Sequence, residues 1–374
     1  MIPWRTAVGN GFASPVVAKG RVFLFDAELT RPAKERLHCF EESTGKPLWT
    51  FAYGVVYGDY AYNPEQSGGP TATPIVEAGK IYTVGGNGHV HCLDTEKGGV
   101  LWENDLGKTY QIRELQCRPS PLIEGDLLIV VTGAQAGACV VALDKGTGNE
   151  VWKALEDSVL NCSPMVFTVG KRRQLIVWSG EAVTSLNPLT GETYWRERLI
   201  TNTNYGTSTP VFQNNRLLIA GLMLELSTGD TPTATILWPD TKALAKRILS
   251  NTSTALFRDD CIYSARGKGE LVCLEAATGK QLWQVDTITE PKKGACIHIV
   301  PTSDATYLFT DEGNLICAEL TPTGYHEISR AHLIDPAFPF EGKLRAYAAP
   351  ALANGHIFVR SEKELVCASL IARP

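Results

Sequence analysis

The amino-acid sequence predicts an all-β fold, an eight-bladed β-propeller made of four-stranded blades. Three observations predict it: a tryptophan that returns at a regular spacing, a Thr-Gly turn before it, and a small-small-Pro signal at the start of each repeat. Four short strands with a period of about 45 residues are typical of propeller blades. We therefore expect residues 1–374 to form one continuous domain.

The repeated motif is clearest at Cys273-Leu-Glu-Ala-Ala-Thr-Gly-Lys-Gln-Leu-Trp283, which reads as a strand, a tight turn and a second strand. A worn copy begins at Cys317, with Ile328 in place of tryptophan and one extra residue before the turn. Glycine allows the positive φ that such a turn needs, and the threonine hydroxyl can bond nearby backbone. Regular recurrence assigns the tryptophans to packing between blades: Trp4, Trp49, Trp102, Trp152, Trp195, Trp238 and Trp283.

The spacing of these tryptophans gives the number of blades and the way the array closes. Consecutive tryptophans lie 43 to 53 residues apart, and Ile328 continues the series. Trp4 precedes Trp49 by 45 residues, so the chain begins on the last strand of a blade. Residues 347–370 supply three strands and stop where a fourth is due. We expect the N-terminal strand to complete the last blade, because closure removes a bare sheet edge.

Each strand of the repeat has its own signal. The first follows a small-small-Pro sequence such as Ala13-Ser14-Pro15, and proline fits a strand start because no ladder donor is lost there. The second is apolar, the third follows a glycine and the fourth carries the tryptophan. One repeat departs from the pattern: its Ser227-Thr228-Gly229 sequence lies about ten residues before Trp238 instead of five. The spacings from Trp238 to the tryptophans before and after it still indicate that this repeat forms a blade.

Composition excludes several classes of protein. The net charge of -5 and the pI of about 5.9 argue against a general nucleic-acid surface, which needs a basic face. No apolar run approaches the roughly 18 residues of a membrane helix. Five of the ten cysteines occupy the first position of the motif, where a small buried side chain is expected. The other five form no CxxC pair, so no zinc site of that type is predicted.

The start of the chain leaves its compartment open. It shows no basic segment, apolar segment and cleavage site of a secretory leader. We expect a cytoplasmic protein if the sequence is complete, or an exported protein if a leader has been removed.

These motif copies resemble the quinoprotein-type repeat, whose tryptophan-docking motif runs A-x-D-x-x-T-G-x-x-x-W. The resemblance covers nearly the whole chain and points to the PQQ-binding-like β-propeller repeat proteins. It includes the pyrroloquinoline quinone (PQQ) dehydrogenases and the non-catalytic BamB-type propeller of the bacterial outer-membrane assembly machinery. The likeness to the BamB-type propeller implies a periplasmic or cell-envelope location. The likeness to the PQQ dehydrogenases implies PQQ and calcium as cofactors, yet the adjacent cysteines that many of these enzymes use are missing here.

Function is expected in the loops from each fourth strand to the next first strand, because they differ most between repeats. Together these loops are slightly basic, whereas the whole chain is acidic. The longest, 52–70, holds four tyrosines that could stack a flat ligand or pack the loop onto its blade. A pair of histidines, His89 and His91, faces one side of a strand and is assigned to packing. The residues expected to bind a ligand are Arg118, Asn161, Asn204, Tyr205, Asn251, His298, Arg345 and Tyr347.

The sequence thus favours a non-enzymatic binding or assembly scaffold that holds a protein or a small anion at these loops. No catalytic residue, metal ligand or cofactor is assigned, no nucleic-acid partner is expected and the chain is not expected to span a membrane. The alternative function is a PQQ-dependent alcohol or sugar dehydrogenase. In that case the expected cofactors are PQQ and calcium.

Overall fold

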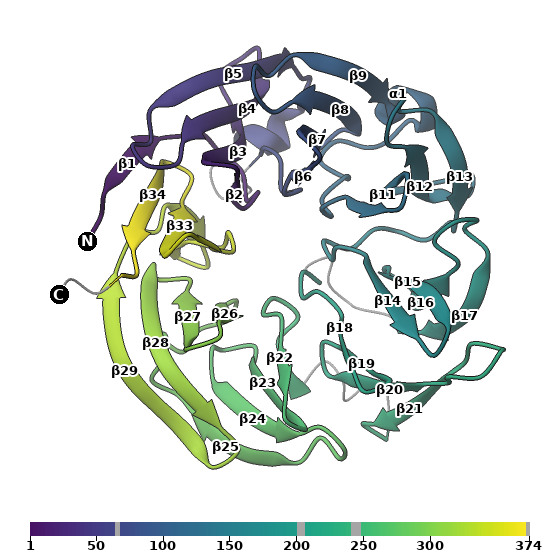
Figure 1. Cartoon of the computed structure of the whole chain (residues 1–374), viewed down its shortest axis with the longest axis vertical. Helices are drawn as coiled ribbons and strands as arrows, with labels where there is room; N and C mark the ends of the chain where they lie inside the picture. Colours follow the sequence, from purple (N-terminus) through teal and green to yellow (C-terminus); the bar gives the residue numbers. More distant parts are fainter. Residues whose placement is uncertain (64–67, 200–205, 241–247, 372–374) are drawn as a thin grey trace. The chain divides into compact units, whose positions relative to one another are not determined.

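The computed structural model of the protein describes residues 1–63, 68–199, 206–240 and 248–371. These residues form eight four-stranded sheets in which every neighbouring pair of strands is antiparallel, as Figure 1 shows. The predicted all-β, eight-bladed β-propeller is therefore confirmed. The chain divides into two compact units, residues 1–156 with 333–374 and residues 157–332. The single continuous domain stays a prediction.

The first unit contains blades 1, 2, 3 and 8 and three short extra elements. Blades 1 to 3 follow the chain in order: β2 (Val16–Ala18), β3 (Arg21–Glu28), β4 (Lys34–Glu41), β5 (Pro47–Gly54); β6 (Ile75–Glu77), β7 (Lys80–Val84), β8 (His89–Asp94), β9 (Val100–Asp105); β10 (Leu122–Glu124), β11 (Leu127–Ala134), β12 (Ala138–Asp144), β13 (Glu150–Ala154). Blade 8 combines both ends of the chain: β32 (Ala351–Ala353), β33 (His356–Arg360), β34 (Glu364–Ser369), β1 (Trp4–Ala7). The extra elements are a 3-10 turn, η1 (Asp59–Tyr62), a one-turn helix, α1 (Leu106–Tyr110), and a hairpin of β30 (Phe338–Phe340) and β31 (Lys343–Arg345).

The second unit contains blades 4 to 7, again in chain order. Their strands are β14 (Met165–Val169), β15 (Arg172–Trp178), β16 (Ala182–Leu186), β17 (Thr193–Arg198); β18 (Val211–Gln213), β19 (Arg216–Ile219), β20 (Leu222–Leu226), β21 (Ala234–Trp238); β22 (Leu256–Arg258), β23 (Cys261–Ala265), β24 (Leu271–Glu275), β25 (Gln281–Val285); β26 (Ile297–Pro301), β27 (Thr306–Thr310), β28 (Asn314–Thr321), β29 (Gly324–His332).

The N-terminal strand completes the last blade, as predicted. Trp4 of β1 lies opposite Cys367 of β34, and Ala7 lies opposite Glu364. Strand β1 therefore occupies the outer position that the fourth strand holds in the other blades. This register fixes two distant parts of the sequence as neighbours, because one slip would turn every side chain of β1 to the other face.

The core of each blade lies in its second and third strands. All eight residues of β11 are buried, and so are all five of β23. Fourth strands such as β5 instead alternate between half-buried and exposed residues, since successive side chains point to opposite faces of a sheet. The motif cysteines lie in this core, and all ten cysteines are free thiols. The motif cysteines are all buried except Cys317, which is half-buried. The packing role predicted for this position is therefore confirmed.

Most motif tryptophans dock on the turn of the following blade. In the first unit the indole Nε1 of Trp49 donates to the carbonyl of Thr95 over 3.2 Å. In the first unit the acceptor lies three residues after the first position of the motif. The other first-unit pairs are Trp4 with Glu42 (2.8 Å) and Trp102 with Lys145 (3.1 Å). In each of these pairs the indole of one blade bonds the turn of the next, and the docking role expected of all seven tryptophans stays a prediction.

The Thr-Gly turn supports this contact in two ways. Gly98 has φ of +71°, and an added Cβ would lie 2.6 Å from Cε3 of Trp49, so only glycine leaves room for the indole ring. In the copies where a threonine precedes the glycine, its hydroxyl accepts a backbone N–H two residues on, as in Thr147 with Asn149 (3.3 Å) and Thr278 with Lys280 (3.1 Å). The turn is thus shaped by its own side chain and fitted to the neighbouring tryptophan.

The second unit contains the same docking and its exception. Trp238 and Trp283 donate to the carbonyls of Ala276 and Thr321 over 2.9 and 2.8 Å. Blade 5, which follows Trp195, has the displaced Ser227-Thr228-Gly229 sequence. The indole of Trp195 donates instead to Oε1 of Gln174 in its own blade (2.9 Å). Blades 4 and 5 are linked by Nε of Arg172, which donates to the carbonyl of Asp230 over 2.9 Å.

The small-small-Pro sequences connect consecutive first strands. The backbone N–H of Ser14 donates to the hydroxyl of Thr73 (3.0 Å), and that of Thr73 donates to Ser120 (2.9 Å). In the second unit Thr209 donates to Thr254 over 2.9 Å. At Thr73, Ser120 and Thr254 the side-chain hydroxyl accepts the backbone N–H of the preceding blade.

The docking contact predicts unequal effects of two glycine substitutions. Gly79 and Gly98 both have positive φ, but an added Cβ at Gly79 meets nothing within 4 Å. Gly79→Ala is expected to cost about 1 kcal/mol of stability through backbone strain alone. Gly98→Ala should cost at least about 2 kcal/mol more, because Trp49 must move. Urea unfolding of both variants checks this, and equal losses would contradict the docking role of Gly98.

Candidate functional site

The structure places the predicted ligand-binding residues in loops of both units. In the first unit Arg118 follows blade 2 and is half-buried. Its Nε donates to the carbonyl of Leu115 (2.8 Å), and its own carbonyl accepts the hydroxyl of Thr71 (2.8 Å). These bonds hold the backbone and the base of the guanidinium in place. A ligand role for Arg118 stays a prediction.

Arg345 and Tyr347 come together at the β30–β31 hairpin. The Arg345 side chain is only 1% exposed and its residue pairs with Phe338 across the hairpin, so the guanidinium lies inside the protein instead of facing solvent. Tyr347 is half-buried in an aromatic cluster, with ring centroids 6.3 Å from Phe12, 5.9 Å from Phe338 and 6.0 Å from Phe340. The sequence indicated Tyr347 but missed the three phenylalanines around it.

In the second unit, the structure brings Asn251 and His298 into one neighbourhood. The carbonyl of Asn251 accepts the backbone N–H groups of Thr207 and Ser208, both over 2.8 Å. The thiol of Cys296 donates to the carbonyl of Thr252 (3.2 Å) and lies 3.7 Å from Nε2 of His298. Burial raises the pKa of Cys296 to about 12, so this thiol is not an activated nucleophile.

The other predicted residues of this unit are Asn161, Asn204 and Tyr205. Asn161 is half-buried between β13 and β14. Asn204 and Tyr205 lie outside the described residues.

The tyrosines of loop 52–70 mostly pack the loop onto its blade. The hydroxyls of Tyr53 and Tyr57 both donate to the fully buried carboxylate of Glu35, which also accepts the backbone N–H of Gly86 over 2.9 Å. Burial and this carboxylate raise the pKa values of both phenols far above their usual range. Tyr60 is 51% exposed and is the one left open to a partner among the described loop tyrosines at 53, 57, 60 and 62.

His89 and His91 lie on one face of β8, opposite Asp105 and Glu103 of β9. The His91 ring is 4.5 Å from that of Tyr53 and is almost fully buried. Burial, with help from His89, lowers the pKa of His91 to about 4. The imidazole is therefore neutral at physiological pH and packs between blades 1 and 2, in line with the packing role expected for it.

A second buried ionic cluster lies near the β1–β2 connection. Burial alone would raise the pKa of Asp26, but hydrogen bonds from His38 and Arg36 lower it to about 2. Oδ2 of Asp26 also accepts the backbone N–H of Gly9 over 2.6 Å. The guanidinium of the fully buried Arg360 donates to the carbonyl of Gly9 as well (2.6 Å). These charges fix the connection between blades 8 and 1.

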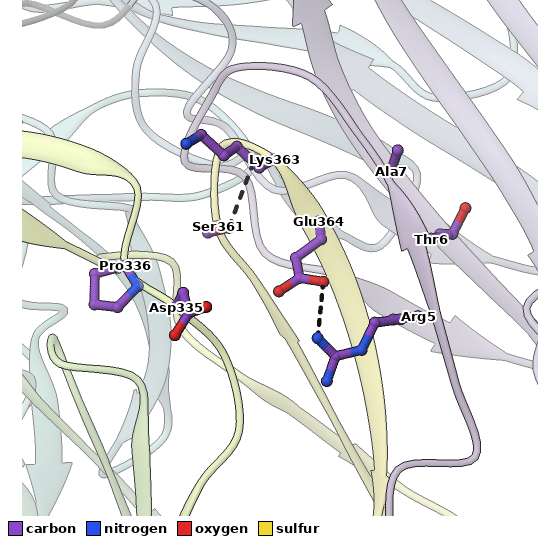
Figure 2. A pocket seen from close by; sticks show the side chains of 8 residues that line it. All are labelled: Arg5, Thr6, Ala7, Asp335, Pro336, Ser361, Lys363 and Glu364. Atoms are coloured by element: carbon purple, nitrogen blue, oxygen red, sulfur yellow. Dashed lines mark hydrogen bonds and ion pairs between the residues drawn. The ribbon is translucent and has the colours of Figure 1, made fainter.

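One pocket in the first unit has the size of a small-molecule site. It has a volume of about 430 Å³ and is lined by residues 5–7 of β1, residues 335–336, and residues 361 and 363–364 of the β33–β34 turn (Figure 2). Arg5 of β1 and Glu364 of the paired strand β34 form an ion pair along one wall of the pocket, with 3.3 Å between Nη1 and Oε2. The sequence analysis missed this pocket. The predicted closure by the N-terminal strand was the signal that could have placed Arg5 near Glu364.

Among the described residues, few side chains are arranged in a way that could bind PQQ or calcium. In this part of the chain no three His, Cys, Asp or Glu side chains converge on a point where they could hold a metal ion. No two cysteines are adjacent in the sequence. We derive no chemistry through either group, and the expectation that no cofactor is bound stays a prediction. No helix among the described residues has the length and apolar character needed to cross a membrane.

A family model described as outer membrane protein assembly factor BamB matches residues 33–243 and 225–371. The chain belongs to this family. The predicted resemblance to the BamB-type propeller is thereby confirmed.

Two curated relatives show both branches of the predicted resemblance. Outer membrane protein assembly factor BamB of Yersinia pestis is 25% identical over 224 residues, which cover 58% of this chain and 51% of that protein. Quinoprotein alcohol dehydrogenase PedH of Pseudomonas putida is 26% identical over 162 residues, covering 40% of this chain and 25% of the enzyme. The matches thus span about half and about a quarter of these relatives.

Solved structures agree on the fold. BamB from Moraxella catarrhalis superposes with a TM-score of 0.62 at 15% identity, covering 97% of both chains. Quinohemoprotein alcohol dehydrogenase from Comamonas testosteroni gives a TM-score of 0.65 at 13% identity, covering 100% of this chain and 77% of the enzyme. At these identities the likeness concerns the fold, which the BamB family shares with the quinoprotein dehydrogenases.

Burial of His91 predicts a pH-dependent stability. The unfolded histidine binds a proton below about pH 6.5, whereas folded His91 does so only near pH 4, so stability falls as the pH drops between these values. The full loss is about 3 kcal/mol. His91→Phe keeps a ring against Tyr53 and should remove this component. Urea unfolding of both proteins from about pH 7.5 to about pH 4.5 measures it. Parallel pH curves for the two proteins would contradict it.

Proposed function

We propose that this protein is a non-enzymatic binding or assembly scaffold. It would hold a partner protein or a small anion at the loops that follow the fourth strands. The observation that carries the proposal is the match to the BamB family, which extends from residue 33 to residue 371. The BamB proteins of Yersinia pestis and Moraxella catarrhalis bear the name of the same kind of factor. The proposal includes a bacterial periplasmic or cell-envelope location.

The arrangement of side chains supports a binding role for the loops. The recurring residues are used inside the protein, because the tryptophans, turn glycines and motif cysteines all pack or bond within and between blades. The loops after the fourth strands do not repeat, so they alone differ enough to recognise one partner. Arg118 and the exposed Tyr60 are the described first-unit side chains best suited to this role, because arginine and tyrosine are frequent in protein interfaces.

A PQQ-dependent alcohol or sugar dehydrogenase is the second candidate. It is favoured by the similarity to PedH, but that similarity covers 40% of this chain. The described residues also lack the converging ligand set discussed above. We therefore rank it below the scaffold.

Position-specific cross-linking tests the scaffold role. A photo-reactive amino acid at Arg118 is expected to trap a partner in the native cells. The matched control is Lys97, which is exposed in the turn at the opposite end of β9. We expect an adduct of defined mass from position 118 and none from position 97. The same adduct from both positions, or none from 118, would argue against a partner at this loop.

Titration with PQQ and calcium tests the alternative. A ligand that binds only the folded state raises the melting temperature once its concentration exceeds Kd. The scaffold predicts no joint shift in melting temperature and no change in the PQQ absorbance spectrum at saturating concentrations. A clear shift that needs both PQQ and calcium would instead favour the dehydrogenase.

A further inference from the structure

The connection from blade 8 to blade 1 is held by the β33–β34 turn. At the end of β33 the guanidinium of Arg360 donates from Nη2 to the carbonyl of Gly9 over 2.6 Å. Within the turn the carbonyl of Lys363 accepts the N–H of Val8 over 2.9 Å. The same turn contains Glu362, so a change at this side chain reaches both contacts.

Two charged groups of this turn each bury an atom that no described residue bonds. One atom is Nη1 of Arg360, a residue that is only 1% exposed. The other is Oε2 of Glu362, a half-buried residue. The two atoms therefore do not bond each other, although the two groups still act on each other electrostatically.

A carboxyl group in this position is costly to charge. Burial takes water from the oxygen, and no donor from the described residues replaces it at Oε2. Burial accordingly raises the pKa of Glu362 to about 7, although Arg360, the backbone N–H of Glu362 itself and Lys363 favour the charged form. Burial lowers the pKa of Arg360, but a guanidinium keeps its proton at neutral pH. Glu362 therefore changes its charge near neutral pH, whereas Arg360 does not.

Other charged groups surround the turn on several elements. They are Arg5 of β1, Asp26 of β3, Arg36 and His38 of β4, Asp335 before β30, Lys363 of the turn and Glu364 of β34. Glu364 is bonded to Arg5, with 3.3 Å between the charged atoms. Asp26 is bonded to Arg36, with 2.9 Å between Oδ1 and Nε. These carboxylates already have cationic partners, so the cations that act on Glu362 are Arg360 and Lys363.

We propose that Glu362 makes the connection between blades 8 and 1 sensitive to pH. With its proton bound, Glu362 stays buried in the turn, and the turn keeps both contacts with residues 8–9. Without the proton, the carboxylate turns outward to water, the turn shifts and these contacts weaken. Ser361 and Lys363 of the same turn line the pocket of Figure 2, so the wall of that pocket moves with them. This inference goes beyond the scaffold role and does not rest on it.

Loss of the proton favours the open turn. A glutamate in water loses its proton near its ordinary pKa of 4.5, whereas Glu362 in the closed turn keeps it up to about pH 7. The closed turn is therefore most stable below about pH 4.5 and becomes less stable as the pH rises to about 7. Across this range the equilibrium constant for opening should rise on the order of 100-fold.

Hydrogen exchange of the full chain tests the proposal. Glu362→Gln keeps the size of the side chain and cannot ionise, so its turn should stay closed at every pH. At about pH 8 the amide of Val8 should exchange about tenfold or more faster in the wild type than in this variant, and at about pH 5 equally fast. Amides of β11 in blade 3 are the internal reference and should not differ. Equal exchange of Val8 at pH 8, or slower exchange in the wild type because the carboxylate bonds Arg360, would overturn the proposal.

Two further variants separate the proton on Glu362 from general damage to the turn. Glu364→Gln is the matched control, because it removes the carboxylate that is bonded to Arg5 and should change exchange alike at both pH values. Lys363→Met removes a cation that favours charged Glu362, so the exchange transition should move to higher pH. Histidines titrate in the same pH range, but the comparison with Glu362→Gln cancels their effect. An unchanged or lower transition in Lys363→Met would contradict the assignment to Glu362.

Discussion

The indole of one blade resting on the turn of the next is the contact on which the rest of the structure depends. It fixes the spacing of neighbouring sheets, because the Nε1 donor must reach one backbone carbonyl, as from Trp49 to Thr95. A neutral hydrogen bond of this kind contributes only about 1 kcal/mol, so the large buried ring supplies most of the stabilisation. This contact also constrains which residues the turn can contain. The turn needs a glycine with positive φ, and where a threonine precedes that glycine, as at Thr147, its hydroxyl accepts a backbone N–H of the turn. Where blade 5 displaces the turn, Arg172 and Asp230 make a different connection and the indole of Trp195 turns to Gln174.

Contacts that recur could be predicted from the sequence, and contacts made once could not. The motif appears often enough for its cysteine, glycine and tryptophan to be read as packing residues, and the pairing of β1 with β34 followed from the spacing. The loops have no such internal comparison. Arg345 looks like a surface cation in the sequence, yet the hairpin β30–β31 buries it beside aromatic rings. The pocket lining comes from three separate segments, and although the predicted closure brings residues 5–7 near 361–364, nothing in the sequence indicates that residues 335–336 lie beside them.

Several side chains that invite a catalytic role are used to hold loops and blades. Glu35 is a fully buried carboxylate that gathers two tyrosine hydroxyls and a backbone N–H, which fastens loop 52–70 to blades 1 and 2. Asp26 and Arg360 likewise meet the backbone of Gly9. In a fold made of short strands, these buried polar contacts hold the long connections in place, just as the tryptophans hold neighbouring sheets together. This division leaves exposed loop residues such as Tyr60 as the variable part of the surface.

The mixed origin of blade 8 has a consequence for the order in which the chain folds. During synthesis β1 emerges well before its partner β34, because the whole second unit lies between them in the sequence. In the meantime β1 need not be loose, because Trp4 can already dock on the carbonyl of Glu42 in blade 1. The N-terminal strand is thus held by its side chain before it is held by its backbone. A nascent chain of this design keeps one sheet edge open until β34 has been made, and in that interval it is most exposed to pairing with other strands.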